Sequence, residues 1–162
     1  MVTPTVLLEA MKAYIQEKTK DILLPVRNKR GEEAGDRPPN VFLMNLPKKE
    51  DEIQQIPYIL IKYLTGKDEK TPGEETEAQA SIRIIVATYA EDAEEGSMAL
   101  LNVISNLRYN FLKDEELNQQ FRLVPPLESI IYPDDTRPYY LGEMMTIWTL
   151  PPVEREVNFN GY

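Results

Sequence analysis

Two segments in the first half of the chain alternate between apolar and polar residues and predict neighbouring β-strands. Residues 58–64 and 80–89 are rich in the β-branched and aromatic side chains that fit a pleated sheet. In residues 80–89, one alternating set is small or apolar apart from Thr88, whereas the other set contains Arg83. We therefore expect an antiparallel pair with one face buried by helices and a second, mixed face that is half exposed or used at an interface.

Two other segments carry apolar residues at the three- and four-residue spacing of amphipathic helices. Residues 4–20 begin with Pro4 after Thr3, a residue type favoured at helix N-caps. Residues 96–113 follow acidic side chains that suit the positive end of a helix dipole. We expect both apolar stripes on the same core. Their members are Leu7, Leu8, Met11, Tyr14 and Ile15 in the first helix, and Leu100, Leu101, Val103, Ile104, Leu107 and Phe111 in the second.

The remaining segments predict short extended pieces and polar loops. Residues 22–26, 41–44, 123–126, 129–132 and 139–150 have extended or strand composition, and residues 114–121 suggest a short helical turn. Residues 27–39 and 65–77 combine glycine, proline and charged side chains, which predicts solvent-exposed loops, the second as a long hairpin tip. The sequence thus predicts a single α+β domain over residues 1–152, in two layers: two main helices on one face of a mainly antiparallel, four- or five-stranded sheet. Residues 153–162 are expected to form a C-terminal arm.

Composition excludes several classes of function. The 162 residues include no cysteine and no histidine, which excludes disulfides, thiol nucleophiles, zinc sites built on these residues and serine hydrolase triads. Asp plus Glu number 27 against 18 Lys plus Arg, and the net charge of -9 repels phosphate backbones and anionic membranes. No segment approaches the roughly 20 apolar residues of a membrane span. The N-terminus lacks the pattern of a signal peptide, so we expect a cytoplasmic protein.

Carboxylates are the remaining candidates for chemistry. The acidic run at residues 91–95 could bind Ca²⁺ or Mg²⁺, but it lacks the ligand spacing and turn glycine of an EF-hand and suits a helix start better. Asp134 and Asp135, with Glu128 or Glu143, could form the carboxylate pair of a glycoside hydrolase, which needs a separation of roughly 5–9.5 Å. Two aspartates after a proline are also ordinary in turns, and we favour that interpretation.

Basic and aromatic residues are candidates for contacts with partners. Cations gather in the loop at residues 27–39, which lacks the glycine-rich fingerprint of a nucleotide loop, so we interpret it as solvated or ordered by a partner. The late aromatic residues suit two roles equally, because such rings pack sheets and also mark interfaces. The cations are Arg27, Lys29, Arg30 and Arg37, and the late aromatic residues are Tyr132, Tyr139, Tyr140 and Trp148.

Six segments carry a likeness to known proteins. They are residues 56–63 (IPYILIKY), 83–92 (RIIVATYAED), 102–104 (NVI), 121–126 (FRLVPP), 139–142 (YYLG) and 146–151 (TIWTLP). Through them the chain resembles small tail proteins of Firmicutes phages and prophages, in particular the tail terminator group, also called tail completion proteins. The likeness covers about residues 41–156 and consists of whole segments without a catalytic motif.

This resemblance implies an α+β subunit that forms a hexameric ring at the head-proximal end of the tail tube, ends tube polymerisation and joins the tail to the head connector. Implied partners are further copies of the chain, the tail tube protein and a connector or neck protein. No membrane, no sequence-specific nucleic acid and no cofactor is implied, although genome DNA would pass through the ring lumen. The implied location is the virion, after assembly in the cytoplasm of the host bacterium.

We predict oligomer or partner contacts, and no catalytic residue, for this chain. A neck or stopper protein of the head-tail connector and, from another class, a small carboxylate-based hydrolase remain as alternatives. The residues predicted at contacts are Arg27, Lys29, Arg30, Arg137, Tyr139, Val153, Arg155, Val157 and Phe159.

Overall fold

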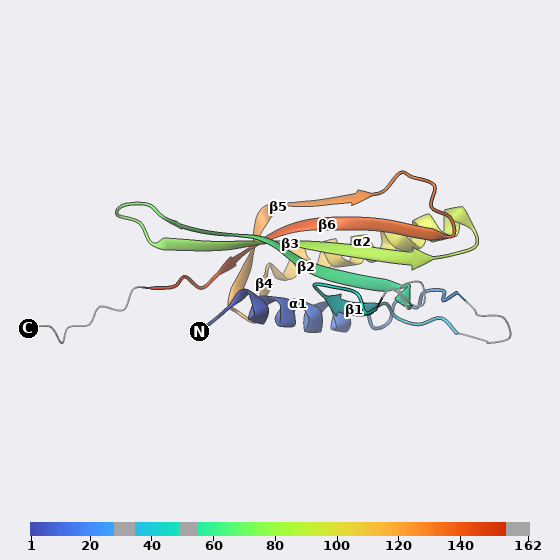
Figure 1. Ribbon diagram of the computed structural model, residues 1–162, viewed down its shortest axis with the longest axis horizontal. Helices are drawn as coiled ribbons and strands as arrows, with labels where there is room; N and C mark the ends of the chain where they lie inside the picture. Colours follow the sequence, from blue (N-terminus) through green and yellow to red (C-terminus); the bar gives the residue numbers. More distant parts are fainter. Residues whose placement is uncertain (28–34, 49–54, 155–162) are drawn as a thin grey trace, which may run out of the picture.

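In the described residues, six β-strands form one curled sheet in an elongated molecule, and two helices pack into a core on one face of that sheet (Figure 1). The computed structural model describes residues 1–27, 35–48 and 55–154. The strand order is β1-β2-β3-β6-β5-β4, and neighbours are antiparallel except for the parallel pair β1 and β2. The elements are α1 (Pro4–Thr19), β1 (Asn40–Leu43), β2 (Tyr58–Lys70), β3 (Thr76–Tyr89), α2 (Ala93–Asp114), β4 (Glu116–Leu117), β5 (Phe121–Ile131) and β6 (Tyr139–Leu150).

The predicted α+β class is confirmed, but the prediction of four or five strands is wrong, because the part of the chain that the structure describes forms a sheet of six. Part of the segment expected as a helical turn, residues 114–121, instead forms β4. Helix α2 ends because Glu115 adopts the left-handed conformation (φ 58°) and donates its N–H to the carbonyl of Phe111 at 2.9 Å. The chain that leaves this cap then pairs with the start of β5.

Strand β5 joins two segments that the sequence separates. The pairing of β5 with β6 shifts register between Val124 and Glu128, which places Pro125 and Pro126 in a bulge. Proline cannot donate to the ladder, so it is tolerated at such an irregularity. The strand therefore continues past the two prolines to Ile131.

The covered face of the sheet shares one apolar core with both helices. Trp148 of β6 meets the Phe111 ring of α2 edge to face, with 5.4 Å between the ring centroids. Its Nε1 donates to Thr146 Oγ1 at 2.8 Å, and Thr146 donates to the carbonyl of Ile82 at 2.9 Å, so these buried polar groups are satisfied. The predicted buried set of β3 is confirmed. Its members Ala80, Ile82, Ile84, Val86 and Thr88 are at most 1% exposed.

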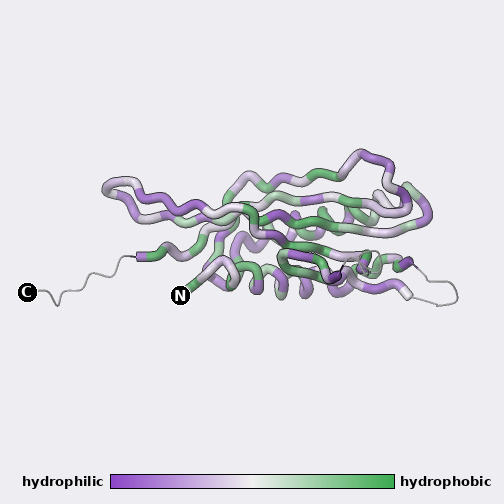
Figure 2. The backbone as a smooth tube through the Cα atoms, in the orientation of Figure 1, coloured by the Kyte–Doolittle hydropathy of each residue, from purple (hydrophilic) through white to green (hydrophobic). Residues whose placement is uncertain are grey.

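The hairpin between β2 and β3 projects from the body as an arm, which we define as residues 64–77 (Figure 1). The expected exposure is confirmed for residues 65–75 and for Glu77, and Figure 2 shows mostly hydrophilic colours along the arm. The expected hairpin is also confirmed, but the expected loop over residues 65–77 is wrong, because β2 and β3 stay paired as far as Lys70 and Thr76. Pairing satisfies the backbone groups of a segment that has no core to enter. The turn uses Gly73 in the left-handed region, at φ 84°.

The helices start as their sequences indicate. Pro4 occupies the first turn of α1, after Thr3 at the N-cap position. The Asp92 carboxylate caps α2 by accepting the N–H of Glu94 at 3.0 Å, which confirms the capping interpretation of the acidic run. The α2 stripe is narrower than expected, because Leu101 is 43% exposed.

Candidate functional site

The face of the sheet opposite the core is not covered by either helix of the described chain. A smaller apolar cluster lies there, built on strands β1, β2, β3 and β6 and on the chain around them. Three of its members, Tyr58, Leu60 and Ala87, are buried there without a helix of the described chain packed on them. The cluster consists of Phe42, Leu46, Ile56, Tyr58, Leu60, Ile85, Ala87 and Leu141.

Polar side chains cross-link three segments on this uncovered face. The Arg83 guanidinium of β3 donates through Nε to a Glu143 carboxylate oxygen on β6, and through Nη2 to Tyr132 Oη at 2.9 Å, just after β5. The hydrogen bond to Glu143, followed by the one to Tyr132, raises the pKa of Arg83 above its ordinary value. The partly shielded ion pair adds a side-chain link between β3 and β6, whose backbones are already paired.

Two predicted contact residues, Arg27 and Tyr139, come together although 112 positions separate them in the chain. The Arg27 guanidinium donates to Tyr139 Oη and lies 5.9 Å from the ring centroid. The Tyr139 ring lies 5.9 Å from that of Tyr89, whose Oη donates to Glu91 Oε1 at 3.5 Å. Partial burial, and then the charge of Glu91, raise the pKa of Tyr89. The two residues thus form a contact within the chain, at the β6 start.

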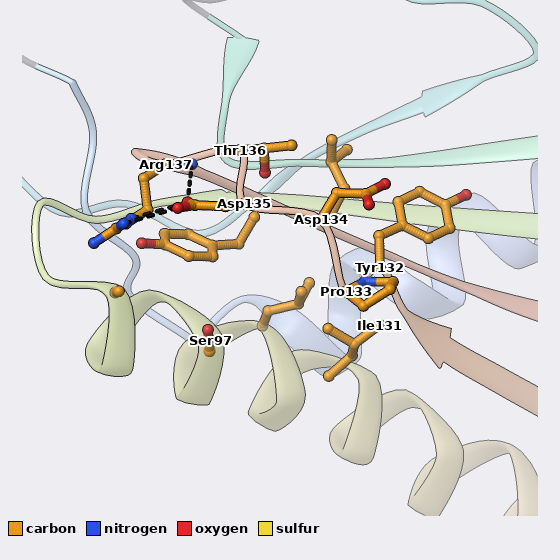
Figure 3. A pocket seen from close by; sticks show the side chains of 12 residues that line it. Ser97, Ile131, Tyr132, Pro133, Asp134, Asp135, Thr136 and Arg137 are labelled. Atoms are coloured by element: carbon orange, nitrogen blue, oxygen red, sulfur yellow. Dashed lines mark hydrogen bonds and ion pairs between the residues drawn. The ribbon is translucent and has the colours of Figure 1, made fainter.

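A hollow of about 420 Å³ lies between the loop after β5 and helix α2 (Figure 3). Arg137 folds back on this loop and binds Asp135 with two hydrogen bonds, Nε–Oδ1 at 2.9 Å and Nη2–Oδ2 at 2.7 Å. The hydrogen bonds from Arg137 lower the pKa of the Asp135 carboxyl. Ser97 of α2 lines the other wall of the hollow.

The four carboxylates considered for hydrolysis do not form the expected pairs. Asp134 and Asp135 line the hollow beside α2, whereas Glu128 and Glu143 line a separate hollow of about 510 Å³ on β5 and β6. A general acid in a glycosidase has a raised pKa, but that of Asp135 is lowered. The described residues contain no group of three or more side chains placed to hold a metal ion.

The other predicted contact residues lie at the edge of the described chain or beyond it. Val153 is 79% exposed, shortly after β6. Lys29, Arg30, Arg155, Val157 and Phe159 lie outside the described residues.

The prediction from sequence missed two open edges of the sheet. β1 pairs only with residues 58–61 of β2, so within the described ranges residues 62–70, the β2 edge, pair with β3 alone. β4 pairs only with Phe121 and Arg122 of β5, so residues 127–131, the β5 edge, pair with β6 alone in the described chain. Such edges are templates for a further strand. In the sequence, only Pro125 and Pro126 indicate an open edge, because prolines cannot donate to a ladder and they interrupt the pairing midway along β5.

Neither helix among the described residues has the length and apolar character that a membrane crossing requires. No family model matches the sequence, and no curated protein is significantly similar to it.

Proposed function

We propose that this protein is a structural virion protein, a tail terminator that assembles into a ring at the head-proximal end of a phage tail tube. There it ends tube polymerisation and joins the tail to the head connector. It acts by shape and contact and uses no catalytic residue or cofactor. The resemblance of residues 41–156 to this group is the starting point of the proposal.

The observation that carries the proposal is the pair of open edges on opposite flanks of one rigid sheet. A ring subunit must present two different, mutually complementary surfaces, because a head-to-tail contact generates a ring when its rotation closes. The helices pack against one face of the sheet, and residues 64–70 and 128–131 on the two flanks are exposed. The polar arm adds a projecting element that can reach a neighbouring copy or the tube (Figure 2).

The charge of the chain agrees with a channel for DNA. A net charge of -9 disfavours adhesion of a phosphate backbone. A ring of such subunits lets genome DNA pass without holding it.

The hydrolase alternative loses support from the carboxylate positions, since Asp135 and Glu143 are each bound by an arginine. A neck or stopper protein uses the same structural features, so only its binding partner distinguishes it. We therefore keep the neck protein as the second candidate.

Polymerisation of tail tube protein with and without this chain tests the proposal. We expect tubes of uniform length that stop growing once the protein is added, in proportion to the number of tube ends. Unchanged tube growth together with binding to isolated connector would identify a neck protein instead. Glycoside turnover that is lost on Asp134→Asn would contradict both structural candidates.

A further inference from the structure

The β5 edge presents backbone groups that face away from the sheet. Tyr132 donates its N–H to the carbonyl of Leu141 at 3.0 Å, and the register of β5 with β6 continues through Ile131 and Gly142. Hydrogen-bonded and non-hydrogen-bonded pairs alternate along an antiparallel ladder. The N–H and C=O of Ser129 and Ile131 therefore point outwards. Ile130 and Ile131 are 51% and 37% exposed there.

The β2 edge follows the same rule. Ile61 accepts the N–H of Met44 at 2.8 Å beside β1, so the next residue, Lys62, faces β3. A bulge at Leu64 takes one extra residue, and beyond it the alternation directs the backbone groups of Gly66 and Asp68 outwards. Leu64 is 44% exposed at the bulge.

The direction of the strands determines how two copies can meet. Along the order β2-β3-β6-β5 every neighbour is antiparallel, so β2 and β5 run in opposite directions. A copy that repeats the sheet side by side therefore brings its β5 edge antiparallel to the β2 edge of the next copy. This contact joins two different surfaces, which is the head-to-tail geometry of a ring.

We propose that the β5 edge of one copy pairs with the β2 edge of the next, with Ser129 opposite Gly66 and Glu128 opposite Lys67. This inference rests on the proposed function, which supplies a second copy as the occupant of the edge. In this register the outward backbone groups of Ser129 and Gly66 face each other, and an acid meets a base. Moving the register by two residues instead places Glu128 opposite Glu69, and like charges directly opposite destabilise a sheet.

The charges support this register. Glu128 has no ion-pair partner within the described chain, and Lys67 pairs only with its exposed neighbour Glu69, at 3.1 Å. Lys67 and Glu69 both oppose residues on the uncovered face of β3, and Glu128 opposes Met145 on the same face of β6. The acid and the base therefore lie on one face of the joined sheet, as a cross-strand pair requires.

The offset between copies is compatible with closure. Residues that lie opposite one another on successive strands form a row across the sheet, and Glu128 shares its row with Met145, Arg83 and Lys62. Lys67 is five residues beyond Lys62 in the chain but only four rows further, because the bulge absorbs one residue. Four rows are about 13 Å along the strands, against about 19 Å across four strands. The strands then tilt by about 35° from the ring axis, a tilt found in closed barrels.

Disulfide cross-linking tests the register, because the natural chain contains no cysteine. Within one chain, positions 67 and 128 are separated by three strand spacings across the sheet and four rows along it, together about 19 Å, which is too far for a disulfide. In the proposed register they form a non-hydrogen-bonded pair with Cα atoms about 4.5 Å apart, which fits one. Oxidised Lys67→Cys/Glu128→Cys should give a ladder of covalent oligomers, whereas each single variant should remain monomeric.

The matched control is Glu69→Cys/Glu128→Cys, two residues out of register on the same face. Faster cross-linking of this control would overturn the register. Dimers from either single variant would indicate a symmetric contact and overturn the head-to-tail pairing, as would absence of the ladder.

A backbone substitution tests the edge itself. Ser129→Pro removes an N–H that faces outwards, so the pairing of β5 with β6 should persist and the melting temperature should match that of Ser129→Ala. We expect assembly to weaken about tenfold or more in the proline variant only. Equal assembly of two folded variants would contradict the inference. If the proline variant melts lower, the cross-linking result decides.

These outcomes separate the inference from the proposed function. A ladder without capped tubes leaves the strand pairing in place and removes the tail role. Capped tubes without a ladder leave the tail role and remove the strand pairing.

Discussion

The two faces of the sheet differ in what their residues do, although they alternate along the same strands. Met144 on the covered face is fully buried, whereas its neighbour Met145 on the uncovered face is partly exposed and borders a surface hollow. The covered face stabilises the fold through apolar burial. The uncovered face carries only the smaller apolar cluster, so we expect this face and the open edges to contribute less to stability.

Alanine substitutions of the two neighbouring methionines should show the largest difference in stability between the two faces. Met144→Ala should lower the free energy of unfolding by about 2–5 kcal/mol, because it leaves a cavity in the core. Met145→Ala should cost less than about 1 kcal/mol. Urea denaturation of both variants measures the difference. Equal losses would mean that the uncovered face carries as much of the fold as the covered one.

The ion pair on the uncovered face should have an intermediate effect. Glu143→Gln leaves Arg83 without its carboxylate partner, which should cost about 1 kcal/mol, since both side chains keep contact with water. A double-mutant cycle with Arg83→Met isolates the interaction energy. A coupling energy near zero would show that this pair does not hold the strands together.

The contact between the two helices should make the stability of the protein depend on pH. Tyr14 of α1 donates to Asp114 Oδ2 of α2 at 2.6 Å, and this hydrogen bond lowers the pKa of Asp114. Its contribution is complete above the ordinary aspartate pKa of about 3.9, and is lost as the pH falls through the lowered value. Tyr14→Phe should therefore lower the melting temperature at pH 7 and reduce its fall between about pH 5 and 3. Parallel pH profiles for the two proteins would argue against this.

The smallest effect on stability is expected at the C-terminus. Deletion of residues 153–162 should change the free energy of unfolding by less than about 0.5 kcal/mol, because Val153 lies exposed beyond β6. Assembly should weaken more than folding. Thermal melts and sedimentation of the shortened chain measure both, and equal losses in the two would reject a separate arm.

The sequence predicted those elements whose residues interact locally. The alternation of β3 and the stripe of α1 are visible because each repeats its own period against one core. The extent of β2 and β3 in the arm was missed, since its charged residues resemble a loop until the partner strand is known. The open edges were also missed, because they depend on how far β1 and β4 run beside distant strands.

The predicted contact residues Arg27 and Tyr139 also depend on contacts between distant segments, which the sequence alone does not reveal. Their composition suggested a surface for partners, but the fold brings them together across 112 positions. Arg137 likewise binds Asp135 two residues away. Single-residue chemistry therefore does not distinguish a contact between molecules from a contact that the chain makes with itself.

Electron microscopy of tail tubes incubated with the wild-type chain and with Ser129→Pro would show whether this protein caps tubes through its β5 edge. We expect a ring on one end of each tube with the wild type, and bare ends with a proline variant that is folded. Bare ends with the wild-type chain, at concentrations where it stays folded, would contradict this expectation.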